Sequence, residues 1–211
     1  IMDLIIKKDL DLYLRATNGL RVDRITTRFL EKFKRAGGDY VAYGIESGDQ
    51  EVLDRIPKRV TIDQIRRAVK LTKKAGLRVS GFFIFGLLGD TPETMRKTIE
   101  FAKELDLDVA VFNILAPYPG TELWDIIHKS EGRILVEDYD EFHHTANRAL
   151  FTLPNGPDPD EVVKAYRRAH REFYFRPRYA LKQLLKVRSA SQIRELIGGV
   201  KSLLGLQFEE S

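Results

Sequence analysis

The chain has 211 residues, of which 43% are hydrophobic and 31% are charged, and this composition is typical of a folded globular protein and excludes a disordered one. It contains no cysteine, which excludes disulfides and any cysteine-bound zinc or iron–sulfur centre within these residues. No apolar run reaches membrane-spanning length and no leader opens the chain, so we expect no membrane partner and a cytoplasmic location.

Positive charge is concentrated near the C-terminus. Residues 161–201 contain eleven Lys and Arg but only three Glu, a local net charge of +8, whereas the whole chain carries +4. Aromatic residues such as Tyr166 and Phe173 stand between these arginines, a pattern that suits base stacking in RNA binding. Amphipathic helices that bury aromatics and expose arginines have the same pattern. An RNA- or protein-binding module is therefore the alternative function.

Strands and helices are predicted to alternate after a short opening helix. We expect strands at 12–18, 40–45, 79–85 and 109–115, and helices at 26–36, 50–56, 62–75, 92–105 and 121–127. Thr61 with Gln64 forms a capping box, and Thr91 followed by Pro92 opens the next helix. The apolar run over 79–85 predicts a strand covered on both faces. This order indicates an α/β fold with a parallel sheet of about four strands.

The remainder of the chain is less regular. Residues 132–155 predict an irregular excursion, followed by helices at 158–175, 178–187 and 191–204. We therefore divide the chain into 1–135, the α/β part, and 136–211, an irregular segment with a helical extension.

Three of the predicted strands end in short motifs that contain glycine. These are Gly44-Ile-Glu-Ser-Gly48, Phe82-Phe-Ile-Phe-Gly-Leu-Leu-Gly-Asp90 and Pro117-Tyr-Pro-Gly-Thr121. Open α/β sheets and barrels bind ligands at the carboxyl ends of their strands, so these motifs mark the candidate site. No Walker loop, nucleophile elbow or dinucleotide fingerprint occurs, and the four histidines lack the spacing of a metal site.

This ordered series of motifs resembles the second half of the radical S-adenosylmethionine (SAM) barrel. The similarity covers residues 1–135 and is closest to the subgroup that often carries an N-terminal cobalamin-binding domain. It implies a partial TIM-like (β/α) barrel with a C-terminal helical extension. It also implies an enzyme of the Fe–S oxidoreductase type, in which a [4Fe-4S] cluster on three cysteines reduces SAM to a 5′-deoxyadenosyl radical.

Those three cysteines are absent here. The resemblance therefore implies a fragment whose missing N-terminal part, in a longer parent, supplies the cluster loop and completes the site. The cofactors implied are SAM, a [4Fe-4S] cluster in the parent, and cobalamin in the parent. The chain alone is expected to be inactive, neither assembling a cluster nor cleaving SAM, and the sequence leaves its substrate unknown.

The resemblance assigns cofactor-binding roles residue by residue, with no catalytic and no metal-binding residue in this chain. Glu46 would accept the ribose hydroxyls with Ser47 beside it, Lys58 would bind the SAM carboxylate, Gly86 would pack against the adenine, and Ala116, Pro117 and Tyr118 would close over it. Alternatives stay open at three positions. Glu46 could be an acid at a helix N-terminus or form a buried ion pair, Ser47 could cap a helix, and Lys58 could lie in a solvated turn with Arg59 as the competing cation.

Two further features qualify this interpretation. The family's usual Gly-Leu-Pro-Gly-Glu reads Gly86-Leu-Leu-Gly-Asp90 here, so a stiffening proline is lost and the acid is shorter by one methylene. Half a barrel also leaves the strand at 12–18 with an unpaired edge, which predicts a homo-oligomer when the chain is alone.

Overall fold

The computed structural model describes residues 1–136, 138, 148–185 and 198. It divides into two compact units, Ile1–Asn113 and Ile114–Ser211, which are described separately. The division predicted from sequence, at 135/136, followed a change in element type and stays a prediction.

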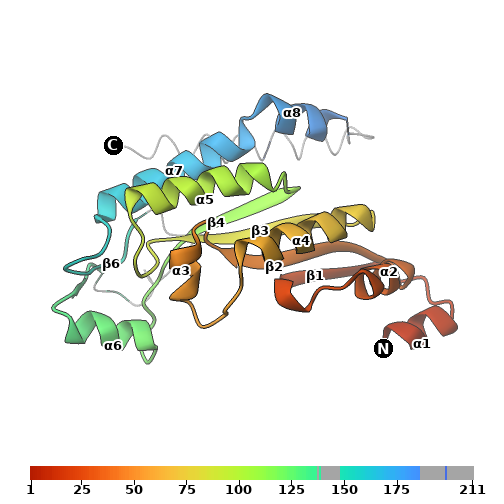
Figure 1. The fold of residues 1–211 in the computed structure, drawn as a ribbon, viewed down its shortest axis with the longest axis horizontal. Coiled ribbons are helices and arrows are strands. Elements are labelled where there is room, and N and C mark those ends of the chain that lie inside the picture. The colour runs from red at the N-terminus through yellow and green to blue at the C-terminus, as the bar shows by residue number, and fades with distance from the viewer. Residues whose placement is uncertain (137, 139–147, 186–197, 199–211) are drawn as a thin grey trace. The chain divides into compact units, whose positions relative to one another are not determined.

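The first unit is an α/β sheet with its elements in the predicted order. They are α1 (Met2–Lys7), β1 (Leu14–Leu20), the 3₁₀ helix η1 (Val22–Arg24), α2 (Thr27–Arg35), β2 (Gly38–Glu46), α3 (Gln50–Asp54), α4 (Ile62–Lys74), β3 (Arg78–Phe85), α5 (Pro92–Glu104) and β4 (Val109–Ile114). The strands run parallel in the order β1-β2-β3-β4 (Figure 1). The predicted fold class, a partial barrel of about four parallel strands, is confirmed.

Element boundaries differ from the predictions by a few residues at most. Strand β1 is displaced by two residues at both ends, predicted at 12–18 and found at Leu14–Leu20. Its first backbone hydrogen bond runs from the amide of Leu14 to the carbonyl of Gly37, just before β2 begins. The neighbouring strand therefore sets where β1 begins, which alternation within β1 does not reveal.

In the first unit, threonine side chains fix the starts of three helices, as the sequence predicts for two of them. The Thr26 hydroxyl accepts the amide of Phe29 at the start of α2. Thr61 and Gln64 form both hydrogen bonds of the predicted capping box at α4. Thr91 caps α5 with Pro92 in its first turn. These caps satisfy amides that the first helical turn leaves without partners.

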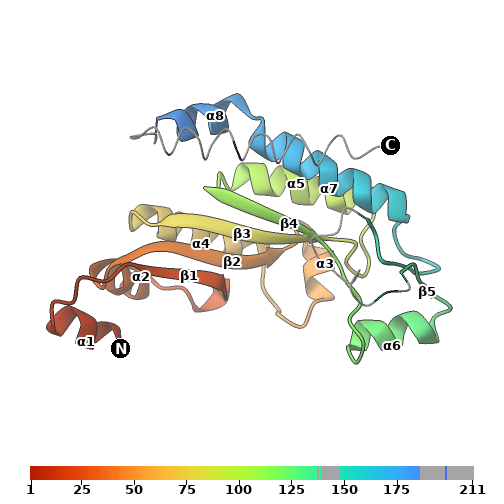
Figure 2. The ribbon, with the colours of Figure 1, turned by 180° about the vertical axis from the view of Figure 1, so that it is seen from behind.

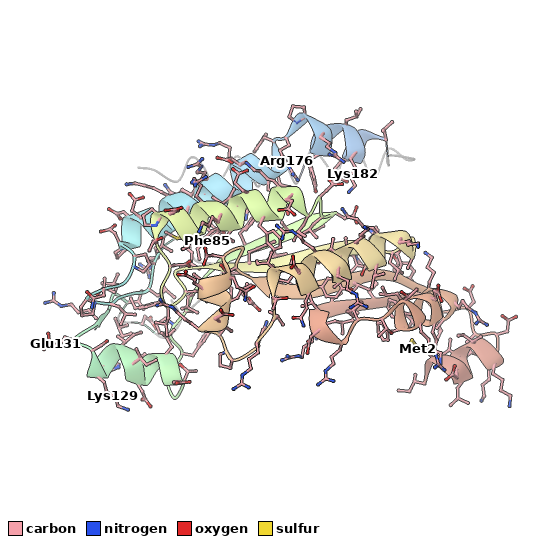
Figure 3. The ribbon with its side chains drawn as sticks, in the orientation of Figure 1. Met2, Phe85, Lys129, Glu131, Arg176 and Lys182 are labelled. Carbon is pink, nitrogen blue, oxygen red and sulfur yellow. The ribbon has the colours of Figure 1, made fainter. Side chains whose placement is uncertain are left out.

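Helices α2 and α4 cover one face of the sheet (Figure 1). The side chains of Tyr43 and Phe83 point to the covered face and are fully buried. The Tyr43 hydroxyl lies 2.6 Å from the Thr72 hydroxyl on α4, and burial raises the pKa of Tyr43 to about 12. Phe85, labelled in Figure 3, stacks on Phe112 of β4 with ring centroids 5.9 Å apart. This apolar layer holds the strand ends in place beneath the loops that follow them.

The opposite face of the sheet is seen from the front in Figure 2. Here Phe82 and Ile84 are only half-buried, so the predicted burial of this strand on both faces is wrong at these two positions. A continuous apolar run does not distinguish a strand covered on both faces from one with a partly open face. Nearer the start of the strands, the Tyr40 hydroxyl donates to Ser80 at 2.6 Å.

The second unit contains a short antiparallel ladder and two helices after α6. Its elements are α6 (Glu122–Lys129), β5 (Arg133–Ile134), β6 (Phe151–Thr152), α7 (Pro159–Tyr174) and α8 (Pro177–Leu184). Val136 and Leu150 form a small core with Trp124 against it. The ladder lies within the segment predicted to be irregular, and the predicted helix at 191–204 lies outside the described residues except for residue 198. Nowhere in the described ranges is a helix both long and apolar enough to span a bilayer.

Gly81 allows the sheet to pack tightly against its neighbours. A Cβ atom at this position would lie 2.4 Å from Cδ1 of Ile45 and 2.9 Å from Cδ1 of Leu107. We expect Gly81→Ala to lower the free energy of unfolding by about 1–3 kcal/mol, because both neighbours are fully buried and would have to move. Urea unfolding measures this change. The exposed Arg67→Ala on α4 is the control, with an effect within about 0.5 kcal/mol, and equal midpoints for the two variants would contradict the prediction.

Candidate cofactor site at the ends of the second and third strands

β2 ends in an irregularity that places Glu46. In the pairing with β3, Gly44 lies opposite Phe82 and Glu46 opposite Phe83, so β2 contains one extra residue, Ile45. Such a bulge re-aims the side chain that follows it and is frequent beside functional sites.

The backbone at Glu46 is in a strained conformation. Its φ angle is +69°, in the left-handed region that a residue with a Cβ atom disfavours. The amide of Ser47 donates to the carbonyl of Ile45 at 3.0 Å, which closes a tight three-residue turn centred on Glu46. A conformation of this kind costs about 1–3 kcal/mol and persists only where surrounding contacts enforce it. Asp9, Arg59, Asp106 and Glu131 also have positive φ angles, and Glu46 is the one among these five residues that lies at the end of a sheet strand.

The Glu46 carboxylate forms an ion pair with the ammonium group of Lys58. The Glu46 side chain is 10% exposed and that of Lys58 is 38% exposed, so the pair lies at the rim of the protein interior. Gly44 leaves the room for it, since a Cβ atom there would come within 2.6 Å of Lys58 Nζ and 2.8 Å of Glu46 Oε1. The structure thus brings together two predicted site residues that are 12 positions apart.

The loop after Glu46 lies tightly against α5. Gly48 makes this approach possible, because a Cβ atom there would lie 2.6 Å from Cβ of Phe101 and 2.7 Å from Cα of Thr98. The Thr98 hydroxyl accepts the amide of Gly48 at 2.9 Å and lies 3.2 Å from the hydroxyl of Ser47. Ser47 is 1% exposed and also accepts the amide of Asp49. The Ser47 hydroxyl therefore forms hydrogen bonds within the loop and to α5. It does not cap α3, because Asp49 is the residue that does so.

Asp49 joins the loop to α5 by charge. One carboxylate oxygen accepts the amides of Glu51 and Val52, and the other pairs with Lys97 at 2.9 Å. Burial acts to raise the pKa of Asp49, but the hydrogen bonds from Lys97 and these amides outweigh it, and the pKa is lowered. Asp49 therefore keeps its charge at neutral pH, as its roles of helix cap and ion-pair partner require.

The turn after β3 is organised by a buried acid, Asp90. Gly86 and Gly89 have φ angles of +82° and +85°, so the turn needs glycine at both positions. The Asp90 carboxylate accepts the amide of Leu87 and the hydroxyl of Thr94, each at 2.9 Å. Asp90 is 4% exposed, and burial raises its pKa to about 6 against the effect of these hydrogen bonds. Although Asp90 is one methylene shorter than the family's usual glutamate, its carboxylate still forms a hydrogen bond with the backbone of the turn.

The two strand-end loops lie next to each other. Arg55 is the first residue after α3, and its guanidinium group lies over Gly89. A Cβ atom at Gly89 would lie 2.3 Å from Nη1 of Arg55. The negative charge of Asp49 is also close enough to raise the pKa of Asp90. Glu46, Lys58 and Gly86 therefore belong to one edge of the sheet, at the carboxyl ends of adjacent parallel strands.

The segment that carries Lys58 is fixed through its main chain. Arg21, directly after β1, donates to the carbonyl of Lys58 at 2.8 Å and also pairs with Asp23. The Gln50 side chain donates to the carbonyl of Val60 and accepts the amide of Ile62. These contacts place the backbone of the segment and leave the Lys58 side chain to reach Glu46.

The remaining predicted site residues belong to the second unit. Ala116 packs against the core of Val136 and Leu150, Pro117 is buried, and Tyr118 is 43% exposed. The carbonyl of Tyr118 accepts the hydroxyl of Thr121, which caps α6. The predicted contacts of these three residues with an adenine stay predictions.

Several residues that shape the site were not identified from the sequence, namely Arg21, Asp49, Arg55, Lys97 and Thr98. Asp49 had a readable signal, an acid immediately before a helix. Lys97 and Thr98 had none, because their role depends on which face of α5 meets the loop.

Part of the chain is similar to a known protein family. Residues 11–102 match the model of the Radical SAM superfamily. The resemblance of this part of the chain to the radical SAM superfamily, predicted from the strand-end motifs, is confirmed.

Relatives and solved structures agree with this assignment. An uncharacterized methyltransferase of Pyrococcus horikoshii is 34% identical over 81% of this chain and 36% of its own length. The anaerobic magnesium-protoporphyrin IX monomethyl ester cyclase of Rubrivivax gelatinosus is 27% identical over 97% of this chain and 36% of its own. The chain thus spans about a third of the length of these relatives.

A solved structure with the same fold carries cobalamin. The radical SAM methyltransferase TsrM from Kitasatospora setae, determined with cobalamin and a [4Fe-4S] cluster bound, superimposes with a TM-score of 0.55 at 20% identity. The match covers 65% of this chain and 30% of TsrM. At this identity the superposition shows that the two chains share a fold, and the assignment to the cobalamin-associated subgroup stays a prediction.

Asp90 makes stability depend on pH in a direction opposite to most carboxylates. Its pKa is raised in the folded state, so between about pH 4 and pH 6 the folded protein binds more protons than the unfolded chain, and stability falls as pH rises through this window. We expect the stability of the wild type relative to Asp90→Asn to fall by roughly 2 kcal/mol between these limits. Urea unfolding at several pH values measures the difference. A difference that does not change with pH would contradict the assignment.

Proposed function

We propose that this chain supplies the adenosine-binding side of the SAM site in a radical SAM enzyme of the cobalamin-associated subgroup. The observation that supports this most strongly is Glu46, a largely buried carboxylate held in a strained turn at the end of β2. Strain of this kind is retained where it serves a site. A carboxylate with two oxygens is also suited to accept both hydroxyls of a ribose.

The residues present fit such a ligand. In the proposal, Glu46 accepts the ribose hydroxyls and Lys58 binds the carboxylate of the methionine moiety as a point charge. The open backbone of the turn at Gly86 lies against the adenine, and Ala116, Pro117 and Tyr118 contribute further contacts. Ser47 acts through the shape of the loop, because its hydroxyl is already engaged by Thr98 and Asp49.

The iron–sulfur cluster does not fit these residues. Radical SAM enzymes hold it with cysteines, and this chain has none, so in the proposal the cysteines come from another part of the parent protein. When bound there, the cluster and SAM supply the radical chemistry of the family. The names of the relatives favour methyl transfer or ring closure as the parent's reaction, with cobalamin as a further cofactor.

The alternative of RNA binding through the basic helices receives no support. Tyr166 and Phe173, two of the aromatics between the arginines of α7, are 4% and 0% exposed. Phe173 packs against Tyr174 and Tyr179 within the second unit. Aromatic rings that are buried in a core cannot stack on bases.

The role of Glu46 is testable by ligand binding. We expect Glu46→Ala to weaken the binding of S-adenosylhomocysteine by about ten- to a hundredfold, because hydrogen bonds to a charged group contribute about 1.5–3 kcal/mol. Isothermal titration with the 211-residue chain measures this. Glu51→Ala, an exposed acid five residues along, is the matched control. Equal affinity in wild type and Glu46→Ala would refute the role, and RNA binding lost in the triple variant Arg167/Arg168/Arg171→Ala would favour the alternative.

The edge of the sheet gives a second prediction. β1 is an edge strand, and the backbone groups on its outer side have no partner strand in the described sheet. We expect the 211-residue chain to self-associate through this edge, as the sequence predicts, and in the parent the missing N-terminal part would cover it. Light scattering after size-exclusion chromatography measures the mass. Thr17→Lys should shift the chain toward monomer, and a wild type that is monomeric at all concentrations would contradict the proposal.

A further inference from the structure

In the proposed site Lys58 and Glu46 bind different parts of the ligand, so they cannot stay paired with each other when the ligand is bound. In this structure they contact one another. We infer that the ion pair with Lys58 blocks the Glu46 carboxylate in the absence of ligand, and that a carboxylate of the ligand releases Glu46 by binding Lys58 in its place. We call this ion pair the lock. The site would thereby favour adenosyl compounds that carry an amino-acid carboxylate over nucleosides that lack one. This inference rests on the proposed function and adds a basis for ligand selection to it.

The first support is that the ion pair is exclusive. In the described part of the chain, the Glu46 carboxylate forms its ion pair with Lys58 alone, and Lys58 forms its ion pair with Glu46 alone. Gly44 provides the space in which the two side chains meet. A nucleoside that is to hydrogen-bond Glu46 must therefore compete with the ammonium group for the carboxylate.

The second support is the unequal freedom of the two partners. Glu46 is held by the tight turn and by the packing of its loop on α5, and its side chain is 10% exposed. Apart from its ion pair with Glu46, Lys58 is held through the backbone: Arg21 donates to its carbonyl, and Gln50 donates to the carbonyl of Val60 two residues further on. The Lys58 side chain is 38% exposed. Lysine has four rotatable side-chain bonds, so its ammonium group can move while Glu46 stays. The lysine is the moving part.

The consequence differs between ligands because of charge. A nucleoside without a carboxylate that displaces Lys58 leaves an ammonium group unpaired and replaces an ionic partner of a buried carboxylate by hydroxyl groups. A ligand with its own carboxylate gives Lys58 a new partner, so the displacement exchanges one ion pair for another. The lock therefore weakens the binding of the first kind of ligand and not that of the second.

The test compares two thioether ligands that differ in the amino-acid moiety. S-Adenosylhomocysteine carries the carboxylate and 5′-methylthioadenosine does not. Isothermal titration of the 211-residue chain would give both affinities for wild type, Lys58→Met, Lys58→Arg and the control Arg59→Met, which removes the neighbouring exposed cation. Circular dichroism would confirm that each variant is folded.

We expect Lys58→Met to bind methylthioadenosine more tightly and adenosylhomocysteine less tightly, so that the ratio of affinities changes by about tenfold or more. Lys58→Arg should keep the wild-type ratio, as should Arg59→Met. If Lys58→Met weakens both ligands equally or changes neither, the lock is refuted while the proposed site stands. If wild type binds neither ligand, the proposed function fails and the lock fails with it.

Discussion

The carboxylate of Glu46 is held in a backbone conformation that its residue type disfavours, and the rest of the site depends on that constraint. The extra residue in β2 turns the chain, and the bond from Ser47 to Ile45 closes the turn. Gly48 then brings the loop against α5, where Thr98 and Lys97 bind it. Each contact offsets part of the strain, so a charged group can remain largely buried at a fixed position.

The parallel sheet explains why distant residues meet at this point. Adjacent strands present their carboxyl ends at one edge, so the loop after β2 and the turn after β3 are neighbours although about 40 residues separate them. The end of β1 also joins this edge, because Arg21, directly after β1, donates to the carbonyl of Lys58. Helix α4 supports the sheet beneath the loops through the Thr72 hydroxyl, which lies 2.6 Å from the hydroxyl of the buried Tyr43.

The turn after β3 shows how a departure from the family motif is accommodated. Leu88 replaces the usual proline, and Asp90 replaces the usual glutamate. The glycines at 86 and 89 keep the positive φ angles that the turn needs, and Asp90 accepts the Leu87 amide directly. Burial of this shorter acid raises its pKa to about 6, so the turn is also the part of the site whose charge changes nearest to neutral pH.

The sequence by itself determined the order of strands and helices, the threonine caps and the three strand-end motifs, because these features depend on side-chain periodicity and local hydrogen bonds. It also identified Glu46 and Lys58, through the resemblance of the motifs. Only the tertiary structure decided that these two residues pair, that Ser47 serves its loop, that Phe82 and Ile84 face a partly open side, and that Arg21, Lys97 and Thr98 support the site. These contacts join residues from separate elements, and their geometry is set by strand register and helix packing, which no local pattern along the chain records.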